Sequence, residues 1–227
     1  MIVEVGAEDW AMAALVGQAR RLSNEKFRGA NRDRGVAKNI QNDLVGSLGE
    51  ILAYRFFDKY LSDDAKSQQN HQLFSLGGGA KHQGADFHLD LHPRKPRLDV
   101  KTFDCDSRKR YFAINAKKHR SLNACCEGYT CLMIPLYSKS AVLEPCVPYN
   151  AVSGWNEASL GGYGDSSFNL PINDFLKLHS DADSYVKVKS AGIFSREEIK
   201  SAINSDKVRS EFYRLCPDAK QLLQGGC

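Results

Sequence analysis

Hydrophobic residues recur with a helical period in the first part of the chain and with a strand period after it. Residues 9–24 have helical spacing, and a longer helix is predicted from about Val36 to about Leu61, where apolar residues stand at every fourth position. The period changes to two over residues 85–91 and again over 98–101, which predicts two strands joined by the turn HPRKP. A hairpin is therefore expected to follow the long helix.

The rest of the chain predicts further strands and helices around this hairpin. Strands are expected at 110–115, 129–137 and 141–149, and helices at 116–126, 194–204 and 207–223. Polar or glycine-rich stretches predict loops at 62–70, at 75–84 and over most of 151–169. Because helices and strands alternate, we expect an α/β protein with helices around one mixed β-sheet, in a single domain of residues 1–227.

Composition agrees with a globular protein, since 42% of the 227 residues are hydrophobic and 26% are charged. Apolar stretches such as CLMIPLY at 131–137 are too short for a membrane-spanning helix, and the acidic N-terminal stretch lacks the basic region of a secretory signal. The seven cysteines show neither disulfide-scaffold spacing nor paired zinc knuckles. We therefore expect a cytoplasmic protein with reduced thiols.

Positive charge is concentrated in one segment, although the net charge of the chain is only +4. Residues 94–120 contain ten basic and three acidic side chains, a charge of +7, whereas the remainder of the chain carries −3. A local excess of Lys and Arg suits a surface that binds a phosphate backbone, and it is equally compatible with a solvated, loop-rich face. The candidates for phosphate contact are Arg108, Lys109, Arg110, Lys117, Lys118 and Arg120.

Acidic residues on the hairpin form the main candidate site. An acid-x-lysine triplet occurs four times in the chain, but only Asp99 and Lys101 lie in a strand pattern, where residues two apart share a face. Asp86 lies on the preceding strand, so its carboxylate can approach that of Asp99. Mg²⁺ is bound by a few carboxylates together with water and phosphate oxygens, and these residues can provide the carboxylates. A cross-strand ion pair on a solvated sheet face is the alternative interpretation.

Glu50 is the third acidic candidate, within the stretch GSLGE of the long helix. On a wheel of 3.6 residues per turn it shares its side with small and aromatic residues such as Ala53 and Phe57. A carboxylate on such a face needs a partner, because burying an unpaired charge is costly; a metal ion or a nearby lysine would serve. Gly46 and Gly49 are expected to let this helix pass close to a sheet.

The order of these residues resembles that of the PD-(D/E)XK nuclease superfamily. A helical glutamate in GSLGE is followed by GAD at 84–86 and by DVK at 99–101, over about residues 36–137. Ala85 stands where the superfamily motif has a proline. The resemblance implies a restriction-endonuclease-like core, in which a central mixed β-sheet is flanked by helices, and Mg²⁺-dependent hydrolysis of DNA phosphodiesters.

The resemblance also implies a role for each residue of the site. Asp86 and Asp99 would bind Mg²⁺, Glu50 would complete or orient the metal site, and Lys101 would position the attacking water. We expect an endonuclease of the type II restriction kind, which cuts double-stranded DNA. A homodimer is expected as well, since symmetric cutting of two strands calls for two sites related by a two-fold axis.

Three other functions agree with the same residues. A structure-specific repair or recombination nuclease, such as a junction resolvase, would use the same site on branched DNA. A DNA-binding module without catalysis would use only the basic surface, and a protein-interaction scaffold would use the acids only as ion pairs. The sequence leaves open the recognition sequence, the cut position, the oligomeric state and the roles of residues 1–30 and 150–227.

Overall fold

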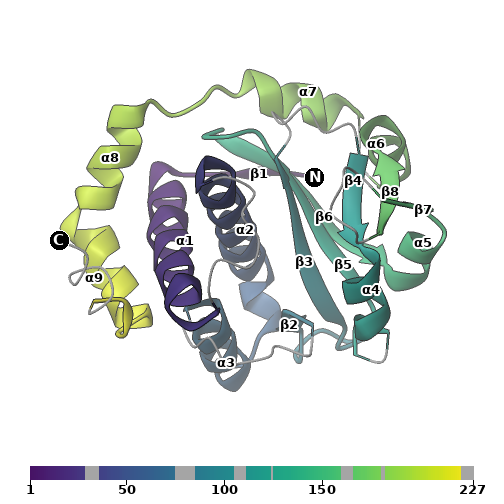
Figure 1. Ribbon diagram of the computed structural model, residues 1–227, viewed down its shortest axis with the longest axis horizontal. Helices are drawn as coiled ribbons and strands as arrows, with labels where there is room; N and C mark the ends of the chain where they lie inside the picture. The colour runs from purple at the N-terminus through teal and green to yellow at the C-terminus, as the bar shows by residue number, and fades with distance from the viewer. Residues whose placement is uncertain are drawn as a thin grey trace.

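A five-stranded mixed β-sheet lies at the centre of the protein, flanked by helices (Figure 1). The structure is a computed structural model, and it describes residues 1–28, 36–74, 85–104, 111–123, 125–159, 166–179 and 182–220. The strands are β1 (Ile2–Glu4), β2 (Phe87–His88), β3 (Arg97–Asp104), β4 (Tyr111–Asn115), β5 (Gly128–Ile134), β6 (Ser140–Pro148), β7 (Asn156–Ala158) and β8 (Ser167–Pro171). The helices are α1 (Ala7–Arg28), α2 (Val36–Phe57), the 3-10 turn η1 (Asp58–Tyr60), α3 (Asp63–Phe74), α4 (Ala116–Leu122), α5 (Tyr149–Ser153), α6 (Ile172–His179), α7 (Ala182–Ser190), α8 (Arg196–Asn204) and α9 (Asp206–Leu215).

The central sheet has the strand order β1-β6-β5-β3-β2, in which β3 and β5 are parallel and the other neighbours are antiparallel. Strand β5 is buried along its whole length, as its continuous apolar run predicts. Because β3 and β5 are parallel, the chain must cross over between them, and β4 and α4 lie in this crossover. The prediction of an α/β protein with a mixed sheet flanked by helices is confirmed at this level.

A second, three-stranded sheet corrects the prediction of a single sheet. Its order is β4-β8-β7, so the strand predicted at 110–115 pairs with β8 and not with the central sheet. Phe112 and Ile114 of β4 pack against Phe168 of β8 in a hydrophobic core of their own. The prediction failed because β7 and most of β8 lie within 151–169, where polar and glycine residues indicate a loop.

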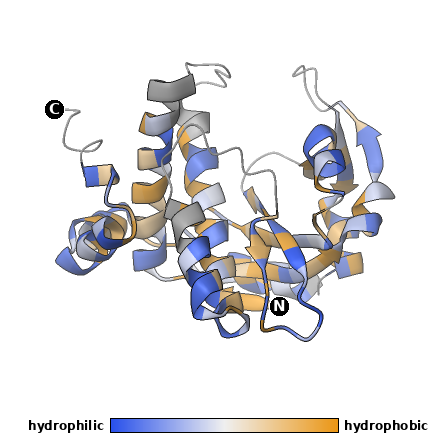
Figure 2. Ribbon diagram, turned by 90° about the horizontal axis from the view of Figure 1, so that it is seen from below, coloured by the Kyte–Doolittle hydropathy of each residue, from blue (hydrophilic) through white to orange (hydrophobic). Residues whose placement is uncertain are grey.

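Alternate residues of β3 face two different hydrophobic cores. Leu98 and Val100 belong to the core that contains residues of α1 and α2, whereas Phe103 belongs to the core of the second sheet. Asp99 and Lys101 have the same parity as Phe103, so they lie on the side of the sheet away from α2. Figure 2 shows the central strands as the largely hydrophobic layer between the helices and the second sheet.

Helix α2 lies very close to β3 at one residue. A Cβ atom added at Gly49 would lie 2.8 Å from Cβ and 3.0 Å from Cγ2 of Thr102, and closer still to its Oγ1. A Cβ atom added at Gly46 would meet nothing within 4 Å. The prediction that glycines let this helix approach a sheet is therefore confirmed for Gly49 and wrong for Gly46.

Helix α3 occupies most of the stretch 62–70 that was expected to be a loop. Its first turn carries Asp63 and Asp64, and the N–H of Ala65 donates a hydrogen bond to Ser62 Oγ (3.2 Å). Acidic and capping side chains at a helix start stabilise the helix, and apolar periodicity does not reveal them. The long helices predicted from apolar spacing, by contrast, are confirmed as α1 and α2.

The strand predicted over 85–91 is shorter in the structure, because β2 spans only Phe87–His88. The chain then turns, and the N–H of Leu89 donates to the carbonyl of Pro96 (3.0 Å). The helices predicted near 194–204 and 207–223 are confirmed as α8 and α9, with α9 ending at Leu215. The predicted loop at 75–84 lies outside the described residues.

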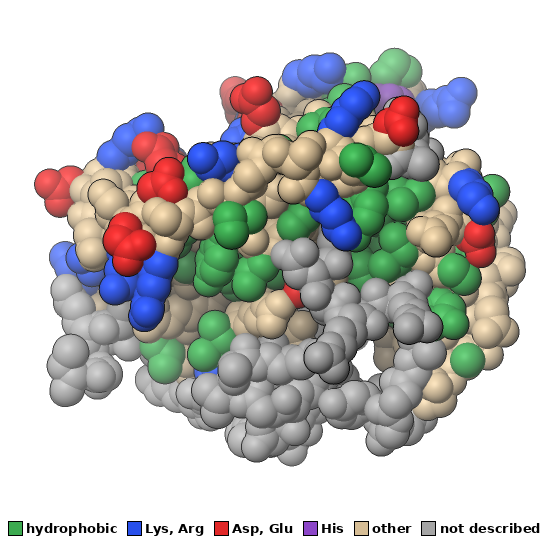
Figure 3. Space-filling model, turned by 90° about the horizontal axis from the view of Figure 1, so that it is seen from above, with side chains coloured by type: hydrophobic (Ala, Val, Ile, Leu, Met, Phe, Trp, Pro, Cys, Tyr) green, Lys and Arg blue, Asp and Glu red, His purple; other side chains and the backbone are tan. Residues whose placement is uncertain are grey.

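Large hydrophobic side chains remain exposed around α6 and α7. Leu178, Val186 and Ile193 keep 67%, 65% and 65% of their surface exposed. Figure 3, which views the side of the molecule on which α7 lies, shows hydrophobic side chains gathered in the middle of this face. None of the described helices combines the length and the apolar character that crossing a membrane requires.

Candidate active site

Asp99 of β3 is the most deeply buried member of the predicted site, with no exposed surface. Its Oδ2 accepts a hydrogen bond from Nζ of Lys101, two residues along the same strand. Its Oδ1 lies 3.0 Å from Nζ of Lys118, which α4 supplies. The second contact is an ion pair without the angles of a hydrogen bond, so Oδ1 has no hydrogen-bond donor among the described residues.

Helix α4 positions Lys118 through its first turn. Asn115, the last residue of β4, caps the helix, and its Oδ1 accepts a hydrogen bond from the backbone N–H of Lys118 (2.9 Å). The side chain of Lys118 is 47% exposed, so it reaches from the surface to a carboxylate that is fully covered. The sequence predicts Lys118 only as a phosphate contact, and the structure adds this ion pair.

Lys101 is held in a setting that disfavours its charge. Burial, followed by the positive charge of Lys118, lowers the pKa of Lys101 to about 8, while the negative charge of Asp86 acts in the opposite direction. Its Nζ also donates a hydrogen bond to the carbonyl of Val100 (3.1 Å) and lies 5.6 Å from the ring centroid of Tyr129. A buried lysine with a lowered pKa beside a buried carboxylate makes this pair a candidate for a functional site.

Asp86 directly precedes β2, next to the end of the pairing between β2 and β3. The described part of β2 pairs only with Leu98 and Arg97 of β3. One residue further on, the Oδ2 of Asp86 accepts a hydrogen bond from the N–H of Val100 (2.7 Å). Continuing the register of the hairpin by one residue places Asp86 opposite Asp99, as the sequence predicts.

Glu50 has a partner that the sequence did not identify. Arg20 of α1 forms two hydrogen bonds with it, from Nη1 to Oε1 (3.2 Å) and from Nη2 to Oε2 (2.7 Å). The same guanidinium donates to the carbonyl of Leu73 in α3 (2.6 Å), so it ties three helices together. The expectation that Glu50 requires a partner is confirmed, and that partner is an arginine.

Asp86 interacts electrostatically with charged residues on both sides of the sheet. Burial tends to lower the pKa of Arg20, but the carboxylates of Glu50 and, further away, Asp86 outweigh it, and the pKa is raised. Asp86 thus lies within electrostatic reach of both Arg20 and Lys101. Helix α2, which carries Glu50, packs on the opposite side of β3 from Asp99. Glu50 is therefore linked to the hairpin acids electrostatically, through Arg20 and Asp86.

The donor groups for a divalent cation are present, but they are neutralised by cationic side chains. No group of three or more Asp, Glu, His or Cys side chains among the described residues could hold a metal ion. Asp86 and Asp99 nevertheless offer carboxylate oxygens at neighbouring positions of one hairpin, and carboxylates fit Mg²⁺ in chemical type. In the structure Lys118 and Lys101 supply the positive charge at Asp99, and Arg20 supplies it at Glu50.

A polar cavity of about 300 Å³ adjoins Asp86, between α3 and the hairpin. Its walls carry Ser62, Asp64, Gln68, Gln69, His88 and Asp90 besides Asp86. Three of the lining residues are aspartates, so the cavity presents acidic and polar groups next to the hairpin. Of the residues of the predicted site, Asp86 lines this cavity.

No match to the chain was found among protein-family models, curated protein sequences or solved structures. The resemblance to the PD-(D/E)XK superfamily stays a prediction that rests on the motif residues.

The predicted phosphate contacts fall into two groups. Arg108, Lys109 and Arg110 lie outside the described residues. Lys117 is exposed on α4 and forms no ion pair with a described residue, so it is available to an anionic ligand. Arg120 is engaged with Glu157 of β7 (2.5 Å), and its guanidinium lies 5.6 Å from the ring centroid of Phe168.

His119, next to Lys118, fixes α4 to the rest of the protein. Its Nδ1 lies 2.7 Å from the hydroxyl of Tyr129 and its Nε2 2.9 Å from Oγ of Ser153. Its ring stacks on Tyr149 with centroids 3.9 Å apart. Burial, followed by the charge of Arg120, lowers the pKa of His119. No spacing in the sequence indicates this role, because the partners come from β5 and α5.

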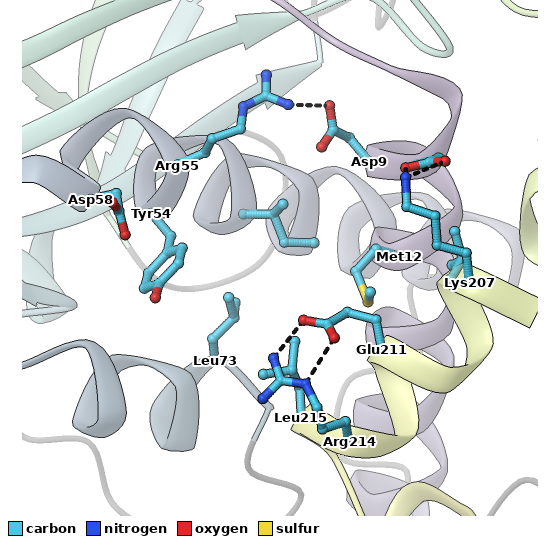
Figure 4. A pocket seen from close by; sticks show the side chains of 13 residues that line it. Asp9, Met12, Tyr54, Arg55, Asp58, Leu73, Lys207, Glu211, Arg214 and Leu215 are labelled. Atoms are coloured by element: carbon cyan, nitrogen blue, oxygen red, sulfur yellow. Dashed lines mark hydrogen bonds and ion pairs between the residues drawn. The ribbon is translucent and has the colours of Figure 1, made fainter. Parts of the chain in front are cut away.

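A larger pocket of about 470 Å³ lies away from the hairpin, between α1, α2, α3 and α9 (Figure 4). Its floor includes apolar side chains such as Met12, Leu73 and Leu215. Its rim is charged, and the rim charges pair with one another: Asp9 with Arg55, Glu8 with Lys207, and Glu211 with Arg214. This pocket therefore presents an apolar floor and a neutralised rim.

Proposed function

We propose that the protein is a Mg²⁺-dependent DNA endonuclease whose site is formed by Asp86, Asp99 and Lys101, with Glu50 at its flank. The observation that carries the proposal is the fully buried carboxylate of Asp99 between two lysines, opposite Asp86 on the same hairpin. A structural ion pair needs one cation, whereas Asp99 has two. After burial, the second cation, Lys118, contributes to the lowered pKa of Lys101, and a lowered lysine pKa supports a catalytic role.

Asp86 and Asp99 would hold the divalent cation. When bound, such a cation stabilises the negative charge that develops on the phosphate and lowers the pKa of a water molecule. Lys101 lies on the same face as Asp99 and would orient the attacking water and neutralise charge at the phosphate. Glu50, held by Arg20, would support the flank of the site through the charge of that guanidinium near Asp86.

Double-stranded DNA is the proposed substrate. Lys117 is exposed on the helix that carries Lys118, one residue from the ion pair with Asp99. Phosphate contacts by such residues position the duplex without reading its sequence. Cleavage of the type II restriction kind, on a restriction-endonuclease-like core, is the preferred form, and cleavage of branched repair or recombination intermediates is the alternative within the same chemistry.

The deciding experiment is cleavage of mixed plasmid DNA with and without Mg²⁺. Wild type is expected to give discrete fragments only with the metal, and Asp99→Asn is expected to give none. Glu127→Gln is the matched control, because Glu127 is an exposed acid that pairs with Arg97 of β3 and is not one of the proposed metal ligands. Loss of cleavage in both variants, or in neither, would contradict the assignment of the site.

A DNA-binding module without catalysis is favoured by one observation. Lysines contact both oxygens of Asp99, so the carboxylate is already neutralised in the structure. The same proteins separate the two functions. If the protein is a binding module, wild type should show no Mg²⁺-dependent cleavage, and Asp99→Asn should bind DNA as wild type does. The proposed homodimer is tested by light scattering, and the apolar face around α6 and α7 is the surface to probe first.

A further inference from the structure

Lys118 contacts Asp99 in a way that differs from the contact of Lys101. The Oδ2 of Asp99 has a hydrogen bond from Lys101, which is on the same strand and whose side chain is mostly buried. Among the residues that the structure describes, the Oδ1 is contacted by the ammonium of Lys118 at 3.0 Å, without hydrogen-bond geometry. A buried carboxylate oxygen that lacks a donor is rare and calls for an explanation, such as an ion that is yet to bind.

The Lys118 side chain is free to leave this oxygen. Its backbone is fixed by the Asn115 cap (2.9 Å), while its side chain is 47% exposed. The four-carbon stem of lysine is flexible, so its ammonium can move from Oδ1 to solvent without a change in α4. Nothing comparable holds for Lys101, whose side chain is 20% exposed and also bonds to the carbonyl of Val100.

We propose that Lys118 is a resident counter-ion that competes with a divalent cation for Oδ1 of Asp99, and that its displaced ammonium then binds a phosphate of the DNA. This inference rests on the proposed function and adds a regulation of the same site. Lys118 keeps Asp99 neutralised in the absence of the cation, and it therefore sets the cation concentration at which the site fills. Its neighbour Lys117 makes no ion pair with a described residue and takes no part in this exchange.

The competition is tested by calorimetric titration of the protein of residues 1–227 with Mn²⁺ alone. Lys118→Met removes the competing charge at nearly constant volume and is expected to bind Mn²⁺ about tenfold more tightly than wild type. Lys118→Arg retains the charge and is expected to bind as wild type does, and Lys117→Met is the matched control with unchanged affinity. Asp99→Asn is expected to lose the site and so identifies it.

The two possible failures are distinguishable. If wild type and Lys118→Met show no Mn²⁺ site that depends on Asp99, both the inference and the proposed metal-dependent function are overturned. If the Asp99-dependent site is present but Lys118→Met binds Mn²⁺ no more tightly than wild type, only the inference is overturned. Thermal unfolding of each variant checks that it is folded before titration.

The second half of the exchange is tested by DNA binding. DNA affinity is measured at several salt concentrations, and the logarithm of the affinity is plotted against the logarithm of the salt concentration. With Ca²⁺ present, the slope for Lys118→Met is expected to be less steep than that for wild type by about one, because one phosphate contact is lost. Without a divalent cation the two slopes are expected to be equal, because Lys118 then remains at Asp99. Equal slopes with Ca²⁺ would overturn the phosphate contact.

Discussion

The close approach of α2 to β3 at Gly49 predicts that an added methyl group is not tolerated there. In Gly49→Ala the new Cβ would lie 2.8 Å from Thr102 Cβ, a distance that no rotation about χ1 of Thr102 can change. Either α2 or β3 must move, and both carry residues of the proposed site. Gly46→Ala, three residues earlier in the same helix, places its Cβ in open space.

The magnitudes follow from two opposing effects. Replacing glycine by alanine inside a helix stabilises it by about 0.5–1 kcal/mol, and this is the whole effect expected for Gly46→Ala. Inserting a methyl group into a packed interface costs about 1–3 kcal/mol. We therefore expect Gly49→Ala to lower the free energy of unfolding by about 1–2 kcal/mol, which is a decrease in Tm of about 2–8 °C for a chain of this size.

The assay is urea unfolding of both variants, followed by circular dichroism and compared at constant m value. Thr102→Ala removes the two outer atoms of the contact, so the double variant with Gly49→Ala should lose less stability than the sum of the single variants. A Gly49→Ala protein as stable as Gly46→Ala would refute the packing of α2 on β3.

Two further predictions concern stability away from the hairpin. Since burial lowers the pKa of His119 below 6.5 in the fold, the unfolded chain binds the proton more readily, and wild type should lose stability as the pH falls below about 6.5. His119→Asn should flatten this dependence when urea midpoints are measured from about pH 7 to about pH 5. Arg20→Met leaves Glu50 and the carbonyl of Leu73 without their donor and should cost about 1–3 kcal/mol. Its control, Arg214→Met, breaks an exposed pair and should leave the urea midpoint nearly unchanged.

Apolar spacing in the sequence was sufficient for the elements that bury a long hydrophobic stripe. It predicted α1, α2 and the buried strand β5. It missed α3, whose polar residues give no stripe, and β8, whose short run Ser167–Pro171 lies next to glycines. Pairing of β4 with β8 is a tertiary choice that local pattern does not specify.

The candidate site was predictable only where its geometry is local. Asp99 and Lys101 share a face because a strand repeats every two residues, and the sequence alone predicts this. The partners Arg20 and Lys118 come from α1 and α4, far away in the chain, and no spacing connects them to the acids. The side of the sheet on which α2 packs was likewise not predictable, although it decides that Glu50 faces Arg20.

The insertion of β4 and α4 between two parallel strands has a consequence for shortening the protein. Helix α4 is anchored by β4, and β4 has its pairing partner at residues 167–171. At the other end, the guanidinium that holds Glu50 belongs to α1. A fragment trimmed to residues 36–137 would keep every motif residue and lose the supports of two of them, so the proposed site would not be preserved in a smaller autonomous unit.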